Sequence, residues 1–354
     1  MNMKVLFIPC YGSENPYHRE LAKALARYDV NVIMSIGISK FPILGAMMVH
    51  NKPNVLHVHW THPFLLSNNR VKSIIKSIRF IAEILILKIL GIKVVWTVHN
   101  LLAHERQDQK LELFFRKLFA RLCNRIIVHC MFAKKAILQT YHLPDYFKDK
   151  IFVIPQGNYI NTYENVESQE QARLKLGLGN REFLFLYFGL IRPYKGVTQL
   201  VDAFRKLQNP QVRLLIVGRP LNDAIRAELL YCCQSDSRIR TFFKFIPDKN
   251  VQTYMNAADV VVLPFQDILT SASVMLAMSF GKSIITPYIG CISELLDSKG
   301  SFLYNPCEEE ELLRAMQQAL NASLAKMGLY NYNKAQHITW NESAQNLYEL
   351  YCKL

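Results

Sequence analysis

Short apolar segments alternate with amphipathic segments along the whole chain, and this rhythm is the feature that most restricts its fold. Strand-length apolar segments separated by stretches of helical periodicity are typical of a parallel sheet with crossover helices. The rhythm starts again near residue 182. The sequence therefore predicts two doubly wound α/β domains in series. The predicted strands are residues 5–9, 30–34, 55–58, 94–98, 125–128 and 152–154, then 183–188, 212–217, 239–242, 260–263, 283–286 and 301–303.

Length and composition agree with two domains of ordinary size. The chain has 354 residues, of which 51% are apolar and 20% charged, and ~150 residues per domain leaves each half enough apolar material for a core. Residues 158–180 are polar and end in Gly-Leu-Gly-Asn, which is typical of a connection between domains. We therefore expect one domain over 1–165 and a second over 166–354, with a closing helix at about 340–354 as a candidate to pack back on the first.

Positive charge is concentrated in the first domain. The chain carries 42 Lys and Arg against 28 Asp and Glu, a net charge of +14. Residues 1–160 hold 22 basic and 9 acidic residues, so this part carries +13 and the remainder +1. The asymmetry suits an anionic partner such as lipid headgroups or polyphosphate. The sequence has no helix-turn-helix, RNA-recognition or zinc pattern, so we do not expect nucleic-acid binding.

The cysteines and the N-terminus predict an intracellular chain. The eight cysteines form no Cys-x-x-Cys pair and no zinc spacing, and the N-terminus runs directly into a strand. No run reaches ~18 apolar residues free of charge, so no transmembrane helix is expected. Residues 71–91 come nearest, but they contain Lys72, Lys76, Arg79 and Lys88. Two interpretations of this segment stay open: a buried helix with a charged edge, or an interfacial helix at an anionic membrane.

Two loops of the second half carry the candidate chemistry. The first follows the strand at 183–188 and runs from Gly189 through Arg192 to Lys195. Two cations beside glycines can clamp phosphate oxygens, although such a loop can equally be a solvated turn. The second opens a helix with Ser271-Ala272-Ser273-Val274. Its backbone N–H groups and positive dipole end suit a diphosphate, and ordinary capping by Thr270 or Ser271 explains the same residues.

Taken together, these loops resemble the carboxyl-terminal half of GT-B glycosyltransferases, in particular the nucleotide-sugar-dependent family 4 (glycosyl transferases group 1) and its near relatives. The resemblance covers most of residues 182–300, with weaker features at 98–100 and 153–158. It implies two Rossmann-like domains facing a central cleft, with the donor on the second domain and the acceptor on the first. It further implies that Lys195, with Arg192 nearby, neutralises the leaving diphosphate while amides around Ser273 and Val274 cradle it. Fixed cations can replace Mg²⁺ in this role, so we expect no metal and no cofactor.

The resemblance also implies further donor contacts. The nucleotide base is expected near Phe245. Family 4 enzymes usually carry two glutamates separated by seven residues, and the matching positions here are Ile268 and Leu276. Neither side chain can replace a carboxylate, so Asp267 or Glu294 is the candidate substitute. This departure leaves open whether the reaction retains or inverts configuration.

Histidines end two strands of the first half. Alternation places His57 and His59 on one face of their strand, and no carboxylate or cysteine stands at ligand spacing, so we expect core or acceptor-lining histidines and no metal site. The resemblance implies that His99 contacts the substrate. Glu105 is the candidate base if the reaction inverts. The predicted acceptor contacts are Tyr11, Gly12, Asn15, Tyr17 and His59.

The sequence therefore predicts a metal-independent glycosyltransferase that moves a hexose from a UDP- or GDP-sugar to a glycan acceptor in polysaccharide or glycoconjugate synthesis. A lipid-linked acceptor at the inner, cytoplasmic face of the membrane is favoured, because the basic domain and residues 71–91 would dock at an anionic surface. Two alternatives remain. An inactive transferase-like binding subunit agrees with the missing glutamates, and a nucleotide-sugar epimerase would need paired carboxylates that the sequence does not reveal.

Overall fold

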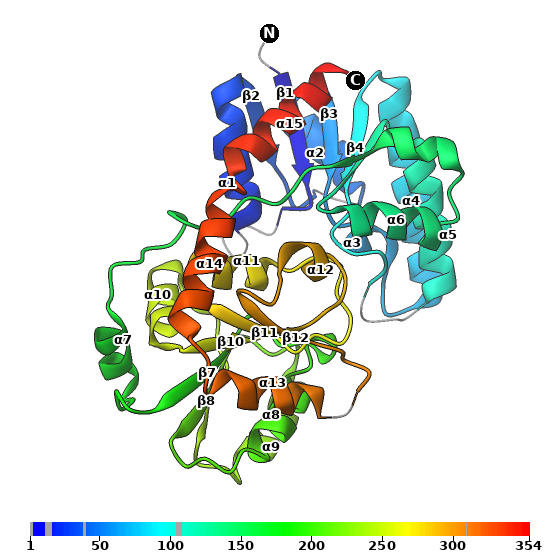
Figure 1. Ribbon diagram of the computed structural model, residues 1–354. Coiled ribbons are helices and arrows are strands. Elements are labelled where there is room, and N and C mark those ends of the chain that lie inside the picture. Colours follow the sequence, from blue (N-terminus) through cyan, green and yellow to red (C-terminus); the bar gives the residue numbers. More distant parts are fainter. Residues whose placement is uncertain (1–2, 11–15, 38–39, 104–107, 309) are drawn as a thin grey trace. The chain divides into compact units, whose positions relative to one another are not determined.

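The computed structural model describes residues 3–10, 16–37, 40–103, 108–308 and 310–354, and it contains two parallel six-stranded sheets (Figure 1). The chain divides into two compact units, Met1–Gly157 together with Ile338–Leu354, and Asn158–His337. Both sheets are covered by helices, as the alternating pattern predicts. The predicted fold class is therefore confirmed.

The sheet of the first unit has the order β2-β1-β3-β4-β5-β6, with every neighbouring pair parallel. Its strands are β1 (Met3–Ile8), β2 (Val30–Met34), β3 (Val55–Val58), β4 (Lys93–Thr97), β5 (Arg125–Val128) and β6 (Ile151–Val153). The helices of this unit are α1 (Pro16–Leu25), α2 (Pro42–His50), α3 (His62–Leu65), α4 (Arg70–Ile89), α5 (Gln109–Leu122), α6 (Met131–Thr140) and α15 (Trp340–Cys352).

The sheet of the second unit has the order β12-β11-β10-β7-β8-β9 and is also parallel throughout. Its strands are β7 (Phe183–Phe188), β8 (Val212–Val217), β9 (Ile239–Phe242), β10 (Val260–Val262), β11 (Ser283–Pro287) and β12 (Ser301–Tyr304). Its helices are α7 (Gln169–Leu176), α8 (Val197–Arg205), α9 (Asp223–Cys233), α10 (Asp248–Ala257), α11 (Ala272–Ser279), α12 (Ile292–Leu295), α13 (Glu311–Ala319) and α14 (Leu324–Gln336).

The central strands form where the sequence predicts them because their side chains are buried on both faces of each sheet, whereas the edge strands β2, β6 and β9 are partly exposed. All residues of β3 and β10 are buried, and β1 becomes fully buried after its first two residues. Such continuous apolar runs are typical of parallel strands covered by helices. Several helices begin at polar caps, and the Asn69 side chain accepts hydrogen bonds from the amides of Val71 and Lys72 at the start of α4. Among the described residues, no helix is long and apolar enough to cross a membrane.

The division between the units lies shortly before the position expected from composition. The polar connection is bonded to the second unit from its start, because the Asn158 amide donates to the carbonyl of Ala335. Further along, the backbone amide of Val166 donates to the Gln252 side chain of α10. The connection therefore belongs to the second unit although its composition resembles a linker.

The closing helix α15 belongs to the core of the first unit. Its residues Ala344, Leu347 and Leu350 are buried against apolar side chains of β1 and α1. Gly157 lies where this helix begins, and a Cβ atom there would overlap the indole of Trp340. The absence of a side chain at residue 157 thus lets the start of α15 approach the chain after β6.

We expect Gly157→Ala to destabilise the first unit by about 1–3 kcal/mol, because the added methyl group must displace Trp340. Urea unfolding followed by tryptophan fluorescence checks this, since Trp60, Trp96 and Trp340 all lie in the first unit. Gly179→Ala is the control, because a Cβ there meets its nearest neighbour, in Glu182, at 3.5 Å. Equal unfolding midpoints for the two variants would refute the close approach.

Candidate active site

The two loops that carry the predicted donor chemistry leave neighbouring strands of the second sheet. β7 and β10 are paired in parallel, and the chain crosses from β7 to β8 on one side while β10 lies on the other. The order of the strands therefore reverses between β7 and β10. Doubly wound sheets bind ligands outside the carboxyl ends of the strands at such a point. The basic loop (Gly189–Gly196) and the start of α11 both lie at this edge.

Two glycines bring these loops into contact. Gly189 has a φ of +146°, and a Cβ atom there would lie 2.9 Å from the Ser273 Oγ. Gly196 has a φ of +69°, and a Cβ atom there would overlap the carbonyl oxygen of Pro264. The backbone amide of Gln266 also donates to the Tyr194 carbonyl at 2.8 Å. The structure thus places the basic loop directly beside the residues that open α11.

Lys195 presents an ammonium group that lacks a carboxylate partner among the described residues. Its Nζ lies 4.4 Å from the centroid of the Phe265 ring and 5.3 Å from that of Tyr194. Burial lowers the pKa of Lys195 to about 7, and the nearby Arg192 guanidinium contributes in the same direction. An anion beside Lys195 would favour its charged form and so oppose both the burial and the repulsion from Arg192. The electrostatics of this site therefore favour the binding of an anion.

The start of α11 supplies backbone donors beside this cation. The Ser271 Oγ accepts a hydrogen bond from the Val274 amide and so caps the helix, as ordinary N-capping predicts. In the described structure the amides of Ala272 and Ser273 donate no hydrogen bond. These two N–H groups, at the positive end of α11, are available to an anion.

The other predicted donor residues follow three strands of the second sheet. Phe245 is exposed after β9, Asp267 is exposed after β10, and Glu294 is exposed on α12 after β11. Ile268 and Leu276 are buried, each with 7% of its surface exposed. Both apolar replacements therefore belong to the interior of the unit. The donor roles of the three exposed residues stay predictions.

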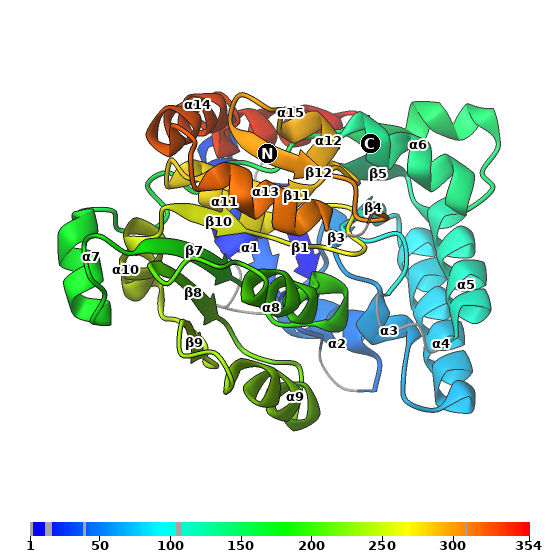
Figure 2. The same ribbon diagram turned by 60° about the horizontal axis from the view of Figure 1, so that its bottom comes forward.

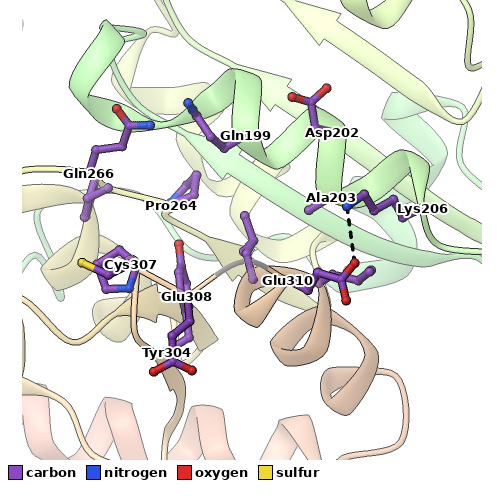
Figure 3. Close-up of a pocket in the computed structure, with 14 residues that line it drawn as sticks. Gln199, Asp202, Ala203, Lys206, Pro264, Gln266, Tyr304, Cys307, Glu308 and Glu310 are labelled. Atoms are coloured by element: carbon purple, nitrogen blue, oxygen red, sulfur yellow. Dashed lines mark ion pairs between the residues drawn. The ribbon is translucent and has the colours of Figure 1, made fainter.

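A pocket that sequence reasoning missed lies behind the loop after β10 (Figure 3). Its volume is about 290 Å³. Pro264, Phe265 and Gln266 form one wall, and α8 and the chain after β12 form the others. An ion pair of 3.7 Å between Lys206 and Glu310 lies at its edge. No motif marks this pocket, because its lining comes from three distant segments that only the fold brings together.

The histidines predicted in the first unit form one buried aromatic cluster. The His57 and His59 rings stack 4.3 Å apart, which confirms that they share a face of β3. The His59 Nδ1 lies 3.3 Å from the Nε2 of His99, and the His99 ring stacks on Trp60 at 4.4 Å. Tyr17 lies edge-on to His99, with 5.0 Å between ring centroids. The cluster thus joins the loop after β3 to the loop after β4.

These imidazoles are held in the neutral form. Burial lowers the pKa of His57, His59 and His99 well below 6.5, and neighbouring histidines lower it further. Within the described ranges, no group of three or more His, Cys, Asp or Glu side chains could hold a metal ion. His59 is only 1% exposed. Its ring packs against other aromatic rings of this unit, and its predicted role in acceptor binding stays a prediction.

Four predicted site residues lie outside the described residues: Tyr11, Gly12, Asn15 and Glu105. Of the predicted acceptor loop, Tyr17 is described, and it is buried at the start of α1.

Comparison with known proteins identifies the class to which the fold and the donor loops point. Residues 182–322 match the family model for glycosyl transferases group 1, and residues 35–158 match that for glycosyltransferase family 4. A GDP-mannose:glycolipid 4-beta-D-mannosyltransferase from Xanthomonas campestris pv. campestris is 28% identical over 273 residues, covering 76% of this chain and 72% of the relative.

Solved structures with the same fold span nearly the whole chain. Sucrose-phosphate synthase from Thermosynechococcus elongatus aligns with a TM-score of 0.79 and 18% identity, covering 99% of this chain and 98% of that one. Anabaena HepE in complex with UDP-glucose aligns with a TM-score of 0.77 and 19% identity, covering 99% and 100%. The fold is GT-B, and the protein is a glycosyltransferase. The chain belongs to the group 1, family 4 glycosyltransferases.

Acidification is expected to destabilise the first unit. Unfolding returns the buried histidines to a pKa near 6.5, so the unfolded chain binds more protons once the pH falls below that value, and stability is lost as the pH falls further. Each such histidine should cost up to about 2 kcal/mol between pH 6.5 and pH 5. Urea unfolding followed by tryptophan fluorescence at several pH values measures this loss.

Matched variants identify the source of the pH dependence. His18 is buried among the same rings, burial lowers its pKa to about 3, and its Nε2 has no hydrogen-bond partner in the described structure. His18→Phe should therefore reduce the pH dependence, whereas substitution of the exposed His142 should leave it unchanged. Stability that does not vary between pH 7 and pH 5 would contradict a neutral histidine cluster.

Proposed function

We propose that this glycosyltransferase moves a hexose from a UDP- or GDP-sugar to a glycolipid acceptor in polysaccharide or glycoconjugate synthesis. The observation that carries the proposal is the close approach of the Lys195 loop to the start of α11, where Gly189 lies beside Ser273 and the amides of Ala272 and Ser273 donate no hydrogen bond in the described structure. The relative from Xanthomonas campestris, whose name states a GDP-mannose donor and a glycolipid acceptor, supports both substrates. Neither an epimerase nor a non-catalytic subunit is favoured by these findings.

The proposed chemistry rests on stabilising the leaving group. Departure of a nucleoside diphosphate develops negative charge on its terminal phosphate. The Lys195 ammonium and the Arg192 guanidinium would neutralise that charge, and the amides of Ala272 and Ser273 would donate hydrogen bonds to it. Fixed groups of this kind need no metal ion, so we propose metal-independent transfer. His99 as a contact of the donor sugar and Glu105 as a base are parts of this proposal that come from family resemblance.

We also propose that the enzyme works as a peripheral protein at the cytoplasmic face of a membrane. A glycolipid acceptor has its lipid part in a bilayer, and the net charge of +13 on residues 1–160 suits anionic headgroups. The donor would be bound by the second unit, which carries little net charge, and the acceptor by the basic first unit.

The affinity for GDP or UDP is expected to fall as the pH rises above about 7. Lys195 in the empty site has a pKa of about 7, and only its protonated form attracts the diphosphate, so the dissociation constant should rise by up to about tenfold per pH unit between pH 7 and pH 9. Calorimetric titration with each nucleotide measures this. At pH 7, Lys195→Ala should weaken binding by about 1–3 kcal/mol.

Two further variants separate the charge of Lys195 from its packing. Lys195→Arg keeps its proton at all these pH values, so binding should become nearly independent of pH. Lys206→Ala removes a lysine that is paired with Glu310 outside the predicted site, and it should bind nucleotide like the parent protein. Unchanged nucleotide affinity in Lys195→Ala would remove this residue from the donor site.

A further inference from the structure

Helix α4 carries an apolar stripe on its outer face as well as on its inner face. The inner stripe, which includes Phe80, Ile84 and Leu87, is buried in the first unit. The outer stripe follows a spacing of four, three, four, three and four residues, and its large side chains are 45–85% exposed. This outer seam consists of Val71, Ile75, Ile78, Ala82, Leu85 and Ile89. A helix that only covers a sheet needs one apolar stripe, so the second stripe indicates a partner outside the described chain.

Helix α2 extends this exposed surface. Only Ile43 and Ala46 of α2 are buried, whereas Met48 is 81% and Val49 is 61% exposed. Ile36, which lies before this helix, is 71% exposed. Figure 2 shows α2 and α4 in the same region of the first unit. The two helices together expose far more apolar side chain than the scattered single residues of an ordinary surface.

A buried carboxylate connects α4 to α2 through hydrogen bonds. The Oε2 of Glu83, on the inner face of α4, accepts hydrogen bonds from the amides of Ile43 and Leu44 at 2.7 and 3.0 Å. These amides belong to the first turn of α2, where a carboxylate also meets the positive end of the helix dipole. Glu83 is 1% exposed. It therefore fixes the start of α2 against α4, so the exposed residues of both helices keep one arrangement.

The charged residues of α2 and α4 indicate which partner the exposed surface of these helices can bind. Glu83 is the one acidic residue in the sequences of α2 and α4, and it faces inward, whereas Lys72, Lys76, Arg79 and Lys88 all lie on α4. Heptad seams that pair with a copy of themselves normally carry complementary charges beside the seam. Two copies of α4 would instead bring cations to cations. An apolar stripe flanked by cations matches a bilayer with anionic headgroups.

We propose that α2 and α4, joined through Glu83, form one docking surface for an anionic lipid bilayer. The outer seam and Met48 enter the boundary between headgroups and acyl chains, while Lys72 and Lys88 contact lipid phosphates; the Lys76 ammonium donates to the Leu66 carbonyl instead. This inference rests on the proposed function only in that a glycolipid acceptor requires access to a membrane. The surface itself is defined by the exposed side chains, the hydrogen bonds of Glu83 and the distribution of charge.

Vesicle flotation tests the surface with the full chain. The parent protein should float with phosphatidylcholine vesicles that contain phosphatidylglycerol, and less with phosphatidylcholine alone or at high salt. Ile75→Glu combined with Leu85→Glu should lower the partition coefficient at least about tenfold, and Met48→Glu should lower it as well. Lys72→Gln and Lys88→Gln should each lower the partition coefficient about fivefold.

The control is Leu329→Glu combined with Tyr231→Glu. These two apolar residues of the second unit are 59% and 74% exposed. The control variant should float like the parent.

The connection that Glu83 makes between α4 and α2 is tested with two substitutions of this residue. Glu83→Gln keeps an oxygen that can accept from the amides of α2 and should float nearly like the parent, whereas Glu83→Ala should lose binding. Tryptophan fluorescence shows whether Glu83→Ala is folded, and Met48→Glu tests the participation of α2 if it is not. Flotation of the α4 double variant or of Met48→Glu equal to that of the parent would overturn the proposal.

Two other results are informative about the partner and about the enzyme. If sedimentation shows a dimer that Ile75→Glu with Leu85→Glu dissociates, while flotation is unchanged, a second copy covers the seam and the bilayer proposal fails. Nucleotide calorimetry on the same variants should match the parent, because the donor loops lie in the second unit. A parent protein that floats but binds neither GDP nor UDP would refute the proposed function and leave the docking surface supported.

Discussion

The close approach of two loops at the carboxyl edge of the second sheet is the constraint on which the account of function depends. Each approach needs a residue without a side chain. At Gly196 a Cβ atom would overlap the Pro264 carbonyl, and at Gly189 it would press on the Ser273 hydroxyl. Both glycines also have positive φ angles, which side-chain-bearing residues rarely adopt. These two positions therefore bring a half-buried cation and a helix N-terminus to one place, as the proposed binding of a diphosphate requires.

The two units differ in where their charged and neutral polar groups lie. In the second unit, the Lys195 ammonium lies over aromatic rings without a carboxylate partner in the described residues, which makes an anionic ligand its natural counterion. In the first unit the cations are spread over the chain, and the buried polar groups near the ends of β3 and β4 are neutral imidazoles. The basic exterior of this unit would suit the anionic surface proposed above, while the histidine cluster adds no charge to its interior.

The sequence predicts the sheets well because parallel strands are buried on both faces and read as continuous apolar runs. The same reasoning places the His57 and His59 side chains together, since alternation in a strand fixes their face. It does not place the end of the first unit at Gly157, because the polar residues that follow are tied to the second unit by hydrogen bonds such as that of Asn158, which composition does not reveal.

Part of the candidate site can also be predicted from the sequence. Gly189, Lys195 and Ser273 are recognisable as local motifs, and the strand order brings them together. The exposed seam of α4 is harder to predict, because an amphipathic helix with two apolar stripes resembles a fully buried helix in sequence. Only the structure shows that one stripe faces outward and that Glu83 connects the helix to α2.

A crystal structure with GDP or UDP bound tests the central claim most directly. We expect phosphate oxygens within hydrogen-bond reach of the Lys195 ammonium and of the Ser273 amide, between the loops that Gly189 and Gly196 bring together. A nucleotide whose phosphates lie instead in the pocket between α8 and the chain after β12, or anywhere away from both loops, would contradict it.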